Sequence, residues 1–166
     1  MTLRAAAVTP RPLAATPAPR GYRRGKRGGA VAKRVTVVPR GYEMQYDAWG
    51  LTPAVRVGDV LYCSGQLGIG ADGALPPSAE AQLENAFRHL GNVLAAAGFG
   101  FEDVVELTSF HVGLRAEMDA FVRVRDRFLA EPWPAQTAVG VAELGLPGAL
   151  VELRATAVRA GAGRRA

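Results

Sequence analysis

The chain has 166 residues, enough for one domain with a core of ordinary size, and 49% of the residues are hydrophobic. No apolar run approaches the roughly 20 residues that span a bilayer, so we expect no membrane-spanning segment. The single cysteine, Cys63, has no partner for an internal disulfide, and we expect a cytoplasmic protein in a reducing environment.

The basic residues are concentrated at the N-terminus. Residues 1–36 hold nine Arg or Lys and no acid, whereas the remaining residues hold eleven basic and fifteen acidic groups, a net charge of −4. The N-terminal stretch lacks apolar periodicity, so it cannot bury enough surface to offset the entropy of ordering. The sequence predicts a disordered basic tail over 1–36, a folded domain over 37–160 and a disordered C-terminus over 161–166.

Three roles compete for this tail with the interpretation that it is dispensable. A secretory signal needs a continuous apolar stretch, which is missing, and a transit peptide should be amphipathic, which four prolines prevent. An arm that binds nucleic acid stays open, since arginine clusters neutralise phosphates. The tail is also explained if the start codon is mis-assigned ahead of Val31, since the tail would then not belong to the protein. We favour a dispensable or mis-assigned segment.

The folded part begins with predicted β-structure. Residues 34–42 alternate polar and β-branched side chains, which is typical of an edge strand that stops at Pro39. Gly58 and Asp59 separate two β-prone runs. This pattern predicts a hairpin with strands at 54–57 and 60–64.

Two amphipathic helices follow. Ser78 is typical of a helix N-cap and Gly98 of the residue just past a helix end, and apolar residues recur at helical spacing between them. Apolar residues over 118–129 predict a second helix that ends before Pro132.

A strand is predicted between these helices, over 103–114, with Val105, Leu107, Ser109 and His111 on one face. Residues 137–144 and 149–158 predict two more strands. The order β-β-β-α-β-α-β-β predicts an α+β fold, a mixed sheet with both helices on one face. The other face needs a cover, and we expect further copies of the chain to bury it.

Several chemical motifs are missing from the sequence: a GxGxxG turn, a phosphate loop and a CxxC pair. His89 and His111 are not at metal-ligand spacing, so we expect no metal and no cofactor. Ser64 lacks the first glycine of a nucleophile elbow, and Cys63 in VLYCSG is typical of a buried structural thiol. His89 is expected to be structural, and His111 to be structural or an acid/base near neutral pH.

Three segments together resemble the Rid family of reactive intermediate deaminases, also called the YjgF type. They are AVRVGDVLYCSGQLG, then AQLENAFRHLGNVLAAAG running into DVVELTSF, then PAQTAVGVAELGLPGALVELRATAV, and they cover about residues 40–158 in order. The resemblance implies a chorismate-mutase-like fold, a homotrimer and small-molecule sites between subunits.

The resemblance also implies roles for individual residues. In deaminating members an arginine after PA clamps the substrate carboxylate with its planar fork. A glutamate in the last strand and a backbone group near SGQ position the water that attacks the imine carbon. Glu152 matches that glutamate, and Ser64 and Gly65 match the start of SGQ.

Gln136 stands where the arginine is expected, and Leu51, with Trp49 slightly upstream, stands where a tyrosine is expected. This departure is similar to a divergent YjgH-like subgroup. An amide can donate and accept, which suits a neutral carbonyl, amide or ring. Arg154, two residues beyond Glu152, either neutralises Glu152 or a neighbouring subunit, or supplies the missing cation.

The sequence therefore predicts a homotrimer that hydrolyses imines or enamines to carbonyl compounds and ammonia. Glu152 holds the water, Gly65 offers backbone contacts, Gln136 orients the substrate and His111 is a candidate acid or base. A non-catalytic trimer that binds small molecules or modulates a partner is the first alternative, because the arginine is missing. RNA cleavage or binding is the second: the basic tail supports it, and the acidic folded part argues against it.

Overall fold

The computed structural model describes residues 33–159, apart from the side chains of Met44 and Trp49. Its elements are β1 Arg34–Val37, α1 Glu43–Trp49, β2 Ala54–Val57, β3 Val60–Cys63, β4 Gln66–Leu67, α2 Ala79–Ala96, the 3-10 turn η1 Phe101–Asp103, β5 Val104–Val112, α3 Leu114–Arg125, β6 Ala135–Val141 and β7 Val151–Val158. Most of the predicted tail and the predicted C-terminal segment 161–166 lie outside the described residues. β1 begins at Arg34, before the predicted boundary at residue 37.

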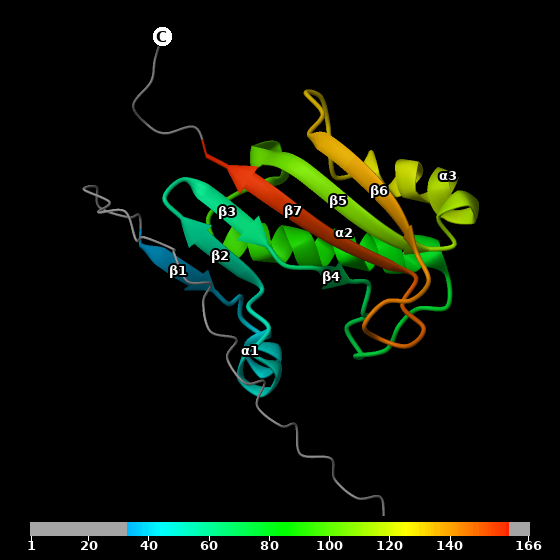
Figure 1. Ribbon diagram of the computed structural model, residues 1–166, viewed down its shortest axis with the longest axis horizontal. Coiled ribbons are helices and arrows are strands. Elements are labelled where there is room, and N and C mark those ends of the chain that lie inside the picture. The colour runs from blue at the N-terminus through cyan, green and yellow to red at the C-terminus, as the bar shows by residue number, and fades with distance from the viewer. Residues whose placement is uncertain (1–32, 160–166) are drawn as a thin grey trace, which may run out of the picture. The chain divides into compact units, whose positions relative to one another are not determined.

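The strands form one mixed sheet in the order β1-β2-β3-β7-β5-β6, with β4 also paired to β7 (Figure 1). Only the β5–β6 pair of the described strands is parallel. Such a pair needs a crossover connection, and α3 supplies it. The hairpin of β2 and β3 forms as predicted, with Gly58 at φ +62° in its turn. The predicted mixed α+β fold is confirmed.

The core lies between the sheet and the helices α2 and α3. Alternate residues of β7 point into it and are at most 3% exposed: Val151, Leu153, Ala155 and Ala157. Figure 1 shows α2 crossing behind the sheet, with α3 beside it next to β6. Phe87 of α2 stacks on Phe121 of α3, with ring centroids 6.5 Å apart. Both helices therefore cover the same face, as predicted.

The ends of α2 follow the sequence closely. The Ser78 side-chain oxygen accepts a hydrogen bond from the Ala81 backbone N–H at 3.3 Å, and Gly98 adopts φ +77° just past the helix. α3 ends at Arg125, earlier than the predicted 129, although Leu129 still packs in the core at 5% exposure.

Three elements were not predicted: α1, the short strand β4 and the 3-10 turn η1. The side chains of α1 that the structure describes are all exposed, so none of them marks a buried face of the helix. Gly50, at φ +66°, ends this helix. No helix among residues 33–159 is long and apolar enough to cross a membrane.

β5 carries a bulge at Val105, which has no partner on β7. An extra residue shifts the alternation of side chains along a strand. Val104 is 6% exposed and Val105 is 46% exposed, so the prediction that Val105 shares one face with Leu107, Ser109 and His111 is wrong. Past the bulge the prediction holds, because Ser109 and His111 are fully buried.

The second face of the sheet is left uncovered by α2 and α3. It presents Tyr62 of β3 and Val158 of β7, which are 51% and 37% exposed. Glu152 and Arg154 alternate with the core residues of β7 and therefore lie on this face as well.

Candidate functional site

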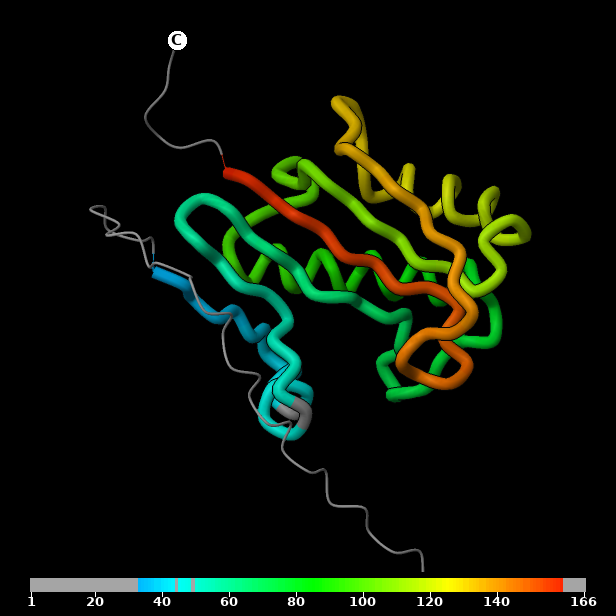
Figure 2. The backbone as a smooth tube through the Cα atoms, in the orientation of Figure 1, coloured from blue at the N-terminus to red at the C-terminus, as the bar shows by residue number. Residues whose placement is uncertain are grey.

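A bulge between β3 and β4 forms one side of the candidate site. Both strands pair with β7, but residues 63–65 separate the pairs Tyr62–Thr156 and Gln66–Leu153 and face only two residues of β7. Figure 2 shows the chain from β3 to β4 running beside β7. A bulge bends a strand and redirects its side chains, and bulges are common next to active sites.

Gly65 lies in this bulge, in contact with Glu152. A Cβ atom added to Gly65 would overlap the carboxylate of Glu152. Glycine, which lacks that atom, leaves room for the carboxylate. The structure thus brings together two residues that the sequence placed in one site.

The Glu152 carboxyl lies among apolar neighbours on the second face. Its register partners are Leu67 on β4 and Phe110 on β5, and paired residues share a face. No ion pair of the described residues uses this carboxylate. Burial raises the pKa of the Glu152 carboxyl. A half-buried carboxyl with a raised pKa is a candidate proton acceptor in a reaction near neutral pH.

Ser64 ties the bulge to the loop that follows α1. Its hydroxyl donates to the Thr52 carbonyl oxygen at 2.6 Å, and its backbone N–H donates to the Pro53 carbonyl oxygen at 2.9 Å. The loop also carries Leu51, whose side chain is 55% exposed. Trp49 ends α1, and its side chain lies outside what the structure describes. Leu51 and Ser64 are therefore near neighbours in the fold.

Arg154 lies on the same face as Glu152 and is exposed. Within the described part of the protomer it forms no ion pair with Glu152. The predicted neutralisation of Glu152 by Arg154 is therefore absent from a single protomer, and a role toward a neighbouring subunit stays a prediction.

Gln136 lies on the other face of the sheet. The parallel register pairs it with Leu107 of β5, so the two side chains share the helix-covered face. Glu152 pairs with Phe110, three residues further along β5 and thus on the opposite face. One protomer does not bring Gln136 to Glu152.

His111 points into the core, away from Glu152. It is fully buried and packs edge-on against Phe121 of α3, with ring centroids 5.0 Å apart. Neither of its ring nitrogens has a hydrogen-bond partner among the described residues, and nor does the hydroxyl of Ser109. Burial lowers the pKa of the His111 imidazole. We therefore remove His111 from the candidate site, because a ligand at Glu152 would not touch it.

His89 and Cys63 have structural roles, as the sequence predicted. The Ile69 carbonyl oxygen accepts from His89 Nε2 at 2.8 Å, which leaves Nδ1 to accept from the Tyr42 hydroxyl at 2.6 Å. Cys63 is buried, and burial raises the pKa of its thiol to about 12. A thiol with that pKa is a poor nucleophile.

Two hollows of about 250 and 490 Å³ lie at the end of α3 and beside the loop between β6 and β7, and neither is lined by Glu152 or Gly65. Among residues 33–159, no group of three His, Cys, Asp or Glu could hold a metal ion. Neither hollow therefore provides a closed site around Glu152.

Sequence reasoning missed three residues near the predicted site. Phe110 and Leu67 flank Glu152, and the alternation of β5 past its bulge was a signal for Phe110. Arg125 of α3 donates to Gln136 through Nη1 at 3.0 Å. No local pattern could have found Arg125, because the contact depends on how α3 packs against β6.

Comparisons with known proteins agree with this fold. Residues 47–159 match the family described as Endoribonuclease L-PSP. The RutC family protein YjgH of Escherichia coli strain K12 is 38% identical over 112 residues, which cover 67% of this chain and 86% of the relative. A 2-iminobutanoate/2-iminopropanoate deaminase of Bos taurus is 37% identical over 111 residues, which cover 64% of this chain and 77% of the relative.

Solved structures give the same result. The structure of protein YjgH matches with a TM-score of 0.68 and 36% identity, over 75% of this chain and 95% of that one. RidA from an Antarctic Psychrobacter species matches with a TM-score of 0.62 and 33% identity, over 66% of this chain and 88% of that one. The resemblance to the Rid family, and to YjgH in particular, is confirmed. The chain belongs to the YjgF family, whose sequence description is Endoribonuclease L-PSP.

Proposed function

We propose that the protein hydrolyses reactive imines or enamines to carbonyl compounds and ammonia, at a site built around Glu152 and Gly65. The observation that carries the proposal is the half-buried Glu152 carboxylate, which has no ion-pair partner among residues 33–159 and fits into the space left by Gly65. Relatives at 32–37% identity are named 2-iminobutanoate/2-iminopropanoate deaminases, which supports this reaction class.

Glu152 acts as the base in this reaction. Its carboxylate takes a proton from water while the water oxygen bonds to the imine carbon, and the C=N electron pair moves to nitrogen, to which Glu152 passes that proton. In the resulting carbinolamine, Glu152 takes the hydroxyl proton as the carbonyl forms and the C–N bond breaks, and it gives this proton to the departing ammonia. The raised pKa of Glu152 suits both proton transfers.

The site is shared between subunits of a homotrimer in this proposal. The uncovered sheet face carries exposed apolar side chains such as Tyr62 and Val158, which another copy can bury. Glu152 and Gln136 lie on opposite faces of one protomer, so a neighbouring copy is required to bring them to one ligand. We place the trimer in the cytoplasm, because its one thiol suits a reducing compartment.

Mixed trimers test the shared site. Glu152→Gln and Gln136→Leu subunits, each impaired alone on an imine that bears an amide carbonyl, should regain activity when they are denatured and refolded together, because some contacts then pair an intact Glu152 with an intact Gln136. Each variant refolded with itself is the control. Equal activity of mixed and unmixed samples, at a confirmed trimer mass, would place both residues in one protomer's site.

A panel of imines tests the reaction itself. Imines generated in place, with and without a carboxylate, should release ammonia faster with protein than without it, and neutral imines should be the better substrates. No release above the uncatalysed rate from any member of the panel would leave the non-catalytic trimer, which binds a small molecule without reaction, as the function.

RNA cleavage is the second candidate, and the family description is the observation that favours it. Arg and Lys bind the phosphates of RNA through their positive charge. On the uncovered face, Arg154 lies near the acids Glu106 and Glu152, and this argues against RNA binding there. We expect residues 33–166 alone to bind RNA more weakly than the full chain, and a nanomolar affinity of that shorter chain would revive this candidate.

A further inference from the structure

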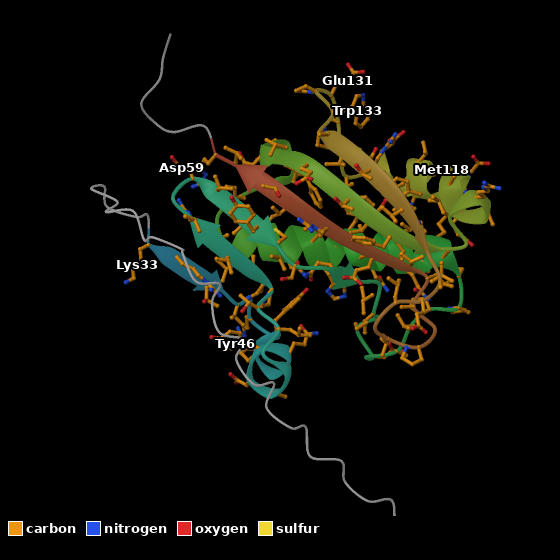
Figure 3. All side chains as sticks on the ribbon, viewed as in Figure 1. Lys33, Tyr46, Asp59, Met118, Glu131 and Trp133 are labelled. Carbon is orange, nitrogen blue, oxygen red and sulfur yellow. The ribbon has the colours of Figure 1, made fainter. Side chains whose placement is uncertain are left out.

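Arg125 is held in place beside Gln136 at the edge of the sheet. Its Nε donates to Asp126 Oδ1 at 2.7 Å, and its Nη1 donates to Gln136 Oε1 at 3.0 Å. The guanidinium carbon lies 5.0 Å from the ring centre of Trp133. Figure 3 shows Trp133 on the loop that leads into β6. The Arg125 side chain is 19% exposed, so the guanidinium is largely enclosed by these groups.

This contact decides which end of the Gln136 amide points outward. A guanidinium carries five N–H donors and no acceptor, so only the amide oxygen can face it. The Gln136 NH₂ group must then point away from Arg125. No hydrogen bond of the described residues uses this NH₂ group, and Gln136 is exposed. Two N–H donors are therefore available to a ligand at this edge.

We infer that Arg125 is a positioning residue that fixes Gln136 as a hydrogen-bond donor, so that the site selects an imine carrying a neutral carbonyl group. The inference rests on the proposed function and narrows its substrate class. It also narrows the expectation that Gln136 both donates and accepts, since Arg125 already uses one of the two lone pairs of the amide oxygen.

The charges around Gln136 favour a ligand group that is neutral. Asp126 lies 2.7 Å from the Arg125 guanidinium and compensates its charge. The hydrogen-bond donor that is left for a ligand is the uncharged NH₂ group of Gln136. A carboxylate binds this amide more weakly than it binds a guanidinium, because the hydrogen bond lacks a donor charge. Trp133, 48% exposed beside Arg125, offers an apolar surface to the rest of the ligand.

Gln136→Glu is the sharpest variant, because it keeps the shape and the acceptor for Arg125 but removes both donors. With an imine that bears an amide carbonyl, we expect kcat/KM to fall at least tenfold, mainly through KM. With an imine of similar size that lacks the carbonyl, we expect less than a threefold change. Equal kcat/KM of Gln136→Glu and the unaltered protein on the carbonyl-bearing imine would overturn the inference.

Arg125→Met should raise KM for the same substrate, and Arg125→Lys should restore part of the loss because an ammonium is also only a donor. Arg123→Met is the matched control: Arg123 lies on α3 too, but pairs with Glu80 and does not touch Gln136. Identical KM values for Arg125→Met and Arg123→Met would overturn the positioning role.

Melting temperatures separate a failure of this inference from a failure of the proposed function. If no imine is hydrolysed, the proposed reaction is wrong, but the contact of Arg125 with residue 136 can still be measured. Arg125→Met should lower the melting temperature more in the Gln136→Glu background than in the unaltered protein, because a charged pair is then lost. Equal shifts in both backgrounds would show that Arg125 does not orient residue 136.

Discussion

The carboxylate of Glu152 occupies the space that a side chain at position 65 would need. The contact arises from the bulge between β3 and β4. This bulge places Gly65 next to β7, at the position where the Glu152 side chain lies on the uncovered face of the sheet. The neighbouring acid, and not the backbone, requires a glycine here, because Gly65 does not adopt a positive φ. Stability and activity should both depend on this contact.

Gly65→Ala should displace the Glu152 carboxylate and lower both stability and ammonia release. Overpacking of this kind costs about 1–3 kcal/mol, which a denaturant titration measures readily. Gly145→Ala is the matched control, because an added Cβ there meets no atom within 4 Å. Adding Glu152→Ala should recover stability but not activity in the Gly65→Ala protein. A fully stable, fully active Gly65→Ala protein would refute the contact.

Glu152 should make the protein less stable as the pH rises. Its folded pKa lies above the unfolded value of about 4.3, so the folded state holds more protons, and stability falls as the pH rises through this interval. Glu152→Gln should therefore melt higher than the unaltered protein at pH 7 and alike near pH 4. A lower melting temperature of Glu152→Gln at pH 7 would mean that a partner stabilises the ionised carboxylate.

His111 should have the opposite pH dependence. Its folded pKa lies below the unfolded value of about 6.5, so the unfolded state holds more protons, and stability falls as the pH drops below that value. His111→Leu should weaken this loss between pH 7 and 5, as thermal melts of both proteins can show. It should keep kcat within about threefold, and a hundredfold loss in the folded variant would return His111 to the active site.

Cys63 should be unreactive in the folded protein. A thiol with a pKa of about 12 carries almost no thiolate at pH 8, and its burial also excludes the reagent. Iodoacetamide should leave native protein unlabelled and add one group per chain after denaturation, as intact mass spectrometry would show. Complete labelling of the native protein within minutes would contradict the buried position of Cys63.

Much of the fold could be predicted because its signals are local. Ser78 and Gly98 bound α2, and the turn at Gly58 fixes the hairpin, each through chemistry contained in a few residues. The bulge at Val105 could not be predicted in the same way. Its position is decided by the register of β5 against β7, two strands about fifty residues apart in sequence.

The candidate site also has a part that the sequence predicted and a part that depends on contacts between distant segments. The sequence resemblance placed Glu152 and Gly65 together, and the structure shows their contact. Gln136 lies on the other face, and His111 lies in the core, because strand pairing decides which face a side chain occupies. Arg125 reaches Gln136 through the packing of α3 on β6, and no motif in the sequence carries that information.

Ammonia release by Glu152→Gln tests the central claim most directly. Glutamine keeps the shape of Glu152 but cannot take a proton from water, and general base catalysis contributes about 10²–10⁴-fold. Glu106→Gln is the control, since Glu106 lies on the same sheet face and accepts a hydrogen bond from Thr156 at 3.0 Å. The account predicts at least a hundredfold loss of kcat for Glu152→Gln and less than a threefold change for Glu106→Gln. Equal rates for Glu152→Gln and the unaltered protein, on an imine that the protein hydrolyses, would contradict it.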